Sequence, residues 1–121
     1  MKTTAKIALT SLVLSLGTGV ALAAPAADNW DNLCASCHGV DGKAQTKTGK
    51  KLKLRDYTDA KVQAELTDEA MIQATADGVK VDGKEKMKGY KAQLSSDEIN
   101  DLVAYIRKFK EIGRASCRER C

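Results

Sequence analysis

Hydrophobic residues recur at helical spacing near the C-terminal end of the chain. Steps of three and four positions place them on one helix face, and they are Ile99, Leu102, Val103, Ile106 and Phe109. Ser95 and Glu98 stand before this run at the spacing of a capping box, in which each side chain pairs with a backbone N–H of the first turn. The pattern predicts a helix that begins near Ser95 and ends near Lys110–Glu111.

Shorter helical segments precede it. Asp28 is a candidate cap for a helix over residues 29–37, and apolar spacing predicts another over residues 59–66. Thr67 is followed by two acidic residues, which favour a helix N-terminus. We expect that helix to end at Ala76.

Two segments between these helices are predicted loops. Residues 39–53 are rich in glycine, lysine and threonine, and residues 79–93 contain Gly83 and Gly89. No segment alternates convincingly between apolar and polar positions as a half-buried strand does. The expected fold class is therefore all-α, a small helical domain.

The first 23 residues have the features of a cleavable signal peptide. Lys2 and Lys6 precede a small, apolar stretch that reaches Val20, and Ala21–Ala23 offers the small-x-small cleavage pattern. We expect export to a bacterial periplasm. The alternative is an anchor retained over the uncharged run 7–27, which contains Thr, Ser, Gly and Pro.

The last ten residues, 112–121, look foreign to the rest of the chain. They have no apolar periodicity and carry three arginines, whereas the preceding segments prefer lysine. The segment resembles a translated sequencing adapter, so we interpret it as a non-native tail and take 24–111 as the working domain. The alternative is a genuine basic tail in which Cys117 and Cys121 pair or stay as thiols.

The net charge of +4 belongs to the two ends of the chain. Without two lysines of the leader and three arginines and one glutamate of the tail, the 20 basic and 16 acidic residues become 15 of each. A neutral domain gives no case for nucleic acid as a partner. At about 88 residues and with few aromatic side chains, it has little material for a core. We expect a non-protein group to complete that core.

The chemistry is concentrated in Cys34-Ala35-Ser36-Cys37-His38. This C-x-x-C-H spacing is the attachment motif of c-type haem. Residues three apart on a helix share a face, so both thiols can reach the two vinyl groups of one haem, and His38 can bind the iron. We expect its second ring nitrogen to donate to a backbone carbonyl. His38 is the only histidine, which excludes bis-histidine ligation.

Other uses of the two cysteines remain open. A Cys34–Cys37 disulfide is compatible with export but would close a very small loop. A thioredoxin-like redox pair needs a βαβ context that the pattern lacks. A zinc site needs a fourth ligand beyond Cys34, Cys37 and His38.

The second axial ligand must come from another part of the chain. Methionine is the natural candidate, and Met71 and Met87 are the only methionines after the leader. Met71 lies inside a predicted helix, where methionine usually packs in a core. Met87 lies in a predicted loop, which can cross to the opposite haem face. We assign Met87, with Met71 or an open site as alternatives.

The domain resembles a bacterial class I c-type cytochrome. The resemblance covers most of 28–110 and is carried by the segments Cys34–Lys43, Leu54–Gln63, Leu66–Glu69, Met87–Tyr90 and Leu94–Arg107. It implies that the first and last helices cross beside one covalent haem, with the axial methionine just before the last helix. Leu33 would then pack on the apolar face of the last helix. Lys88 stands where the family often has proline.

The resemblance implies a soluble electron carrier of the periplasm rather than an enzyme. Its expected partners are redox proteins (a respiratory reductase, oxidase or dehydrogenase), and it is expected to be a monomer without stable membrane insertion after cleavage. Lysines of 43–53 and 84–91 are candidates for docking, and Arg55 and Tyr57 for contacts with the haem propionates. Trp30 is expected to pack in the core. The alternative function is a haem protein that binds gas or peroxide at a labile or open sixth position.

Overall fold

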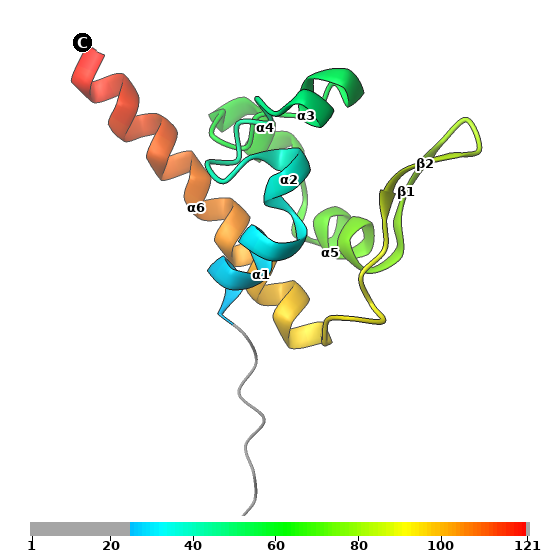
Figure 1. The fold of residues 1–121 in the computed structure, drawn as a ribbon. Helices are drawn as coiled ribbons and strands as arrows, with labels where there is room; N and C mark the ends of the chain where they lie inside the picture. The colour runs from blue at the N-terminus through cyan, green and yellow to red at the C-terminus, as the bar shows by residue number, and fades with distance from the viewer. Residues whose placement is uncertain (1–24, 121) are drawn as a thin grey trace, which may run out of the picture.

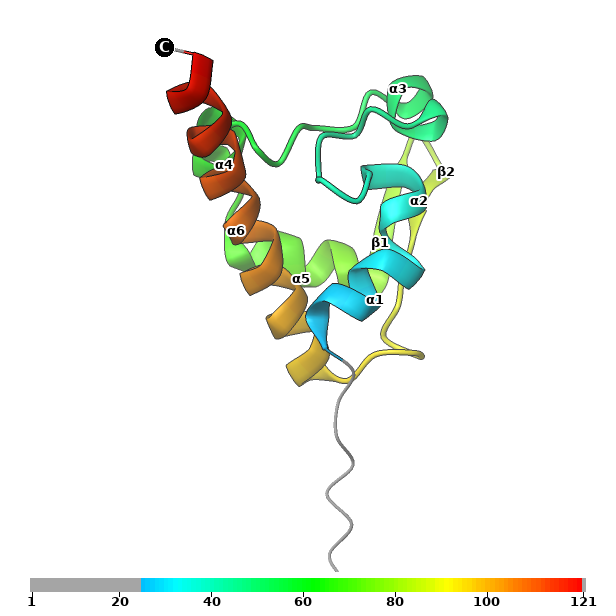
Figure 2. The same cartoon turned by 60° about the vertical axis from the view of Figure 1, so that its left-hand side comes forward.

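The computed structural model describes residues 25–120. The predicted signal peptide and Cys121 lie outside this range, as does the side chain of Cys117. The described helices are α1 (Ala26–Leu33), α2 (Ala35–His38), α3 (Lys47–Leu52), α4 (Ala60–Glu65), α5 (Asp68–Asp77) and α6 (Ser96–Arg120). The strands are β1 (Gly78–Val81) and β2 (Lys84–Lys88). The long helix α6 runs along one side of the molecule, α1 crosses it, and α2 and α3 lie farther from it (Figures 1 and 2).

The core forms where α1 crosses α6, as the family resemblance implied. Trp30 of α1 and Leu102 of α6 are the largest fully buried side chains. Leu33 packs against the same cluster, which also contains Ile99, Val103, Ile106 and Phe109. Helices α4 and α5 also pack on α6, so this one helix organises most of the domain. No helix within residues 25–120 is both long and apolar enough to cross a membrane.

The predicted helix 29–37 is wrong in its details, because the chain forms two helices with a break at Cys34. Helix α1 begins after Pro25, without a side-chain cap from Asp28. Cys34 is the residue at the break, with φ −116° and ψ −37°. The Trp30 indole donates to the Gly39 carbonyl at 3.0 Å, which ties the end of α2 back onto α1.

Side-chain caps define several other helix starts. Thr67 caps α5 as predicted, and Asp59, expected as the first residue of its helix, instead caps α4. The Ser95 N–H donates to the Glu98 carboxylate at 2.9 Å and the Glu98 N–H to the Ser95 hydroxyl at 3.2 Å, which confirms the capping box. Helix α3 was not predicted; its start is capped by Thr46 inside the expected loop 39–53.

The all-α prediction holds for most of the fold but fails at β1 and β2, which form a two-stranded antiparallel hairpin. It projects from the helical body (Figure 1). Asp82 and Gly83 form the turn with φ of 52° and 73°, the positive values that a tight hairpin turn requires. The lysine-rich strand is mostly exposed and lacks an alternating pattern, which is why periodicity missed it. Val79 pairs with Met87, so Met87 lies on a strand rather than in a loop.

Helix α6 also extends past its predicted end near Lys110–Glu111 and reaches Arg120. Gly113 lets this extension pass close to the rest of the chain, because a Cβ there would lie 2.3 Å from the Thr58 carbonyl oxygen. The proposed boundary at residue 111 therefore falls inside a helix. The foreign origin of 112–121 stays a prediction.

Candidate functional site

A cavity of about 850 Å³ lies between the helices and the hairpin. That volume falls in the upper part of the range of small-molecule sites, roughly 300–1,000 Å³. Its apolar lining comes from α1, α5, α6, β1, the segment after α3 and the link between α4 and α5, and includes Leu33, Leu54, Leu66, Ala70, Val79, Leu102 and Ile106. Cys34, Cys37, His38 and both methionines, Met71 and Met87, line it too. The structure thus brings every candidate site residue to one cavity.

The two cysteines are free thiols at the cavity wall. Cys34 is buried and Cys37 is half-buried. Burial raises the pKa of the Cys34 thiol to about 11, and the neighbouring Cys37 adds to that rise. Cys34 therefore keeps its proton at neutral pH. Within the described residues, no group of three or more His, Cys, Asp or Glu side chains is placed to hold a metal ion.

His38 is held by aromatic neighbours. Its ring stacks on Tyr57 with centroids 5.3 Å apart and planes 16° apart, and it lies 5.8 Å from the Trp30 ring. Burial lowers the pKa of His38, which favours the neutral imidazole that metal ligation requires. The expected hydrogen bond to a backbone carbonyl is not formed, because Nδ1 is buried without a partner among the described residues.

Thr46 holds the end of the cysteine motif through two hydrogen bonds, a role that was not predicted from the sequence. Its hydroxyl donates to the Cys37 carbonyl at 2.6 Å and accepts from the Gly49 N–H at 2.8 Å. Gly49 allows this close packing, since a Cβ there would lie 2.3 Å from the Ala44 carbonyl oxygen and 2.8 Å from that of Cys37. A threonine N-cap before a lysine-rich helix was the available sequence signal.

The two methionines reach the cavity differently. Met71 is buried in α5 and belongs to the core cluster. Met87 is half-buried on β2 and packs against that cluster from the hairpin. Two basic residues of the 53–55 segment and two of β2 also line the cavity, namely Lys53, Arg55, Lys86 and Lys88.

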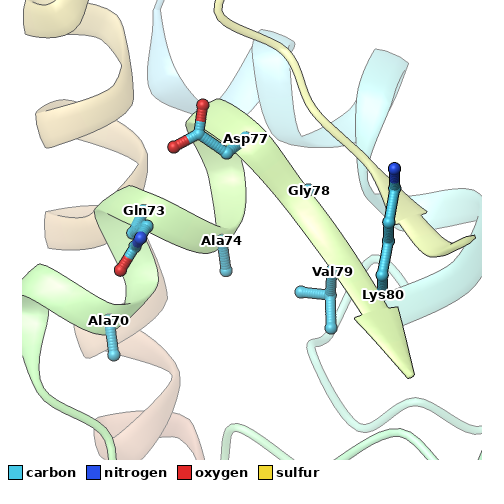
Figure 3. Close-up of a pocket in the computed structure, with 7 residues that line it drawn as sticks. All are labelled: Ala70, Gln73, Ala74, Asp77, Gly78, Val79 and Lys80. Carbon is cyan, nitrogen blue, oxygen red and sulfur yellow. The ribbon is translucent and has the colours of Figure 1, made fainter. Parts of the chain in front are cut away.

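A second hollow of about 310 Å³ lies against α5 and β1 and shares Ala70, Ala74 and Val79 with the large cavity. Figure 3 shows the side chains of Ala74 and Val79 on one side, with the Asp77 carboxylate pointing away from them. Neither cysteine lines this hollow, nor does His38. We therefore assign the chemistry to the large cavity.

Comparison with known proteins gives the family of this chain. The sequence pattern of the family described as Cytochrome c matches residues 23–110. The chain belongs to the cytochrome c family. Members of this family bind haem c covalently and act in haem-based electron transfer. No match was found among the curated proteins.

Two similar solved structures are themselves cytochromes. One is described as KustC0563 c-type cytochrome: 33% identity, a TM-score of 0.62, and coverage of 69% of this chain and 95% of the other. The second is a tyrosine-to-phenylalanine mutant of Kustc0563, with 33% identity, a TM-score of 0.62 and coverage of 70% and 98%. The fold of this cytochrome is accordingly the mostly helical cytochrome c fold with a small hairpin.

The residues present fit haem c. The cavity has the volume and the apolar lining that a large, flat cofactor needs. Two thiols and an imidazole come from the 34–38 segment, and thioethers come from α5 and β2. The basic residues in the lining match the two carboxylates of a haem. Within the described residues, the buried Nδ1 atom of His38 still lacks a hydrogen-bond partner.

Proposed function

We propose that this cytochrome is an exported electron carrier with one haem c bound by Cys34, Cys37, His38 and Met87. The observation that carries the proposal is that these four side chains line a single apolar cavity of about 850 Å³. When bound, haem c supplies an iron that cycles between the ferric and ferrous states and so carries one electron.

Each residue has a distinct role in the proposal. Cys34 and Cys37 would hold haem c covalently, each thiol becoming a thioether as its S–H adds across a vinyl group. His38 would provide a neutral imidazole nitrogen to the iron, consistent with the burial that lowers its pKa. Met87 would provide a thioether sulfur to the iron, a soft ligand that raises the reduction potential relative to bis-histidine ligation.

Two differences favour Met87 over Met71 as the ligand. Met71 sits inside α5, where it packs in the core, and its carbonyl accepts a hydrogen bond from the Thr75 hydroxyl. Met87 lies on a projecting strand between two exposed lysines and is only partly buried where it meets the core cluster. Met87 also lines the cavity, from the hairpin side.

The partners proposed are other redox proteins with acidic docking surfaces. Lys86 and Lys88 are exposed beside Met87, and Lys53 and Arg55 are exposed on another part of the cavity lining. Cations around an electron-exchange site steer acidic partners and speed their association, an effect that falls with ionic strength. The leader predicted over 1–23 supports a periplasmic location for this exchange.

The test is the visible spectrum of the full chain exported from a host that attaches haem c. We expect a covalent, low-spin haem with the weak ferric band of iron bound to methionine sulfur. Met87→Ala should abolish that band, whereas the matched variant Met71→Ala should keep it. A covalent but high-spin haem would instead favour the gas- or peroxide-binding function. A protein without haem would refute both functions.

A further inference from the structure

Tyr90 joins three segments that surround the cavity. Its hydroxyl donates to the Leu33 carbonyl at 2.9 Å, at the end of α1 and directly before Cys34. Its backbone N–H donates to the Thr75 carbonyl of α5 at 2.9 Å. The side chain is buried and lines the cavity. Tyr90 therefore links the chain just after β2 to the segment that carries the cysteine motif.

Met87 lies close to Tyr90, both along the chain and through the hairpin. Met87 is paired with Val79 in the hairpin, three residues before Tyr90. Gly78 and Gly89 allow close backbone contact at the base of the hairpin, since a Cβ on Gly78 would lie 2.5 Å from the Met87 carbonyl oxygen. A Cβ on Gly89 would lie 2.5 Å from the Ala76 carbonyl oxygen. Bulkier residues at either position would push β2 away from α5.

Lys88 adds a contact from the same strand. Its ammonium lies over the Tyr90 ring, 4.9 Å from the centroid, within the range of a cation–π interaction. Lys88 directly follows Met87, so the strand next to the proposed ligand is held to Tyr90 by a side chain as well as by the backbone.

We propose that Tyr90 is a positioning residue that holds β2, and with it Met87, against the end of α1. The inference rests on the proposed function, because it requires Met87 to be the axial ligand. Strand β2 is then held at two points: the Tyr90 hydroxyl bonds to the Leu33 carbonyl, and the Lys88 ammonium lies over the Tyr90 ring. Without the hydroxyl, one of them is lost and the methionine is displaced from the iron more easily.

The experiment compares Tyr90→Phe with Tyr105→Phe in the haem-loaded full chain. Tyr90→Phe keeps the ring and removes only the bond to Leu33. Tyr105 packs against the same core but does not line the cavity, so its variant controls for loss of a tyrosine hydroxyl. Added imidazole competes with the methionine for ferric iron, and its apparent affinity reports how firmly the methionine is held.

We expect imidazole to bind Tyr90→Phe roughly two- to tenfold more tightly than wild type, the range given by one net hydrogen bond. Tyr105→Phe should bind imidazole with the affinity of wild type, even if its melting temperature falls as far as that of Tyr90→Phe. Equal imidazole affinities in both variants would overturn the positioning role and leave Met87 as ligand. Persistence of the methionine–iron band in Met87→Ala would overturn the ligand assignment, and the role of Tyr90 with it.

Discussion

The side-chain oxygen of Gln63 accepts a hydrogen bond from Nη1 of Arg107 at 2.9 Å. The other end of the Gln63 amide donates to the carbonyls of Tyr57 and Ile106, at 2.7 Å and 2.8 Å. Arg107 in turn donates to the Leu66 carbonyl at 2.6 Å. This network of hydrogen bonds connects α4 and the segment of Tyr57 to α6. Tyr57, which stacks on His38, is therefore held in place through its link to α6.

Replacement of Arg107 by lysine should destabilise the protein by about 1–3 kcal/mol. A lysine has no planar fork, so it cannot serve Gln63, the Leu66 carbonyl and the Asp68 carboxylate together. Chemical denaturation of the haem-loaded protein measures the loss. Lys108→Ala, an exposed change one residue away, should stay within about 0.5 kcal/mol of wild type. Equal stabilities for the two variants would contradict the role of the network.

Thr46→Val should affect both stability and the haem site. The change is close to isosteric but removes the donor to the Cys37 carbonyl and the acceptor for the Gly49 N–H. We expect a loss of about 1–2 kcal/mol, as for other N-cap threonines. We also expect a shift of the reduction potential, because the Cys37 backbone carries His38.

The control for that variant is Thr67→Val, which removes the N-cap of α5, because valine has no oxygen to accept from the Ala70 N–H. It should cost similar stability and leave the potential unchanged. A potential shift of the same size in both variants would show that Thr46 acts through stability alone.

Gly49→Ala should prevent normal folding around the haem motif. The added methyl would meet the backbone carbonyl oxygens of Ala44 and Cys37, neither of which is a flexible side chain that can rotate away. We expect the protein to lose about 4 kcal/mol of stability or more, which is the upper end of the range for single substitutions. The readout is the yield of covalent haem after export. Gly83→Asn is the control, because nothing lies within 4 Å of its added Cβ and asparagine tolerates a positive φ.

The sequence predicted best where the signal was local. The capping box at Ser95 is readable from two residues, and the C-x-x-C-H spacing from five. The hairpin was missed although Asp82 and Gly83 carry a known turn signal, because β2 gains its partners from β1 rather than from its own side-chain pattern. The break at Cys34 accompanies the Trp30–Gly39 hydrogen bond, a tertiary contact between residues nine apart. Such contacts leave no periodicity to read.

The candidate site shows the same division. Cys34, Cys37 and His38 were predictable because the motif holds them together in the chain. The choice between Met71 and Met87 was harder, because both line the cavity and only their burial and strand context separate them. The role of Tyr90 could not be predicted from the sequence, since its partner Leu33 lies 57 residues earlier.

The contribution of Tyr90 to stability should disappear at alkaline pH. Burial raises the pKa of Tyr90 above its ordinary value of 10.0. A phenol whose pKa is higher in the folded state binds its proton more tightly there. Its stabilising effect is therefore complete below about pH 10 and is lost as the pH rises through the folded pKa.

The measurement is the free energy of unfolding of wild type and Tyr90→Phe at several pH values from 7 to 11. The difference between them should be constant, at about 0.5–1.5 kcal/mol, up to near pH 10. It should shrink above that, because a phenolate cannot donate to the Leu33 carbonyl. Tyr57 also has a raised pKa but is present in both proteins, so its effect cancels. A difference that stays constant through pH 11 would contradict the link between the phenol proton and the stability that the Tyr90 hydroxyl supplies.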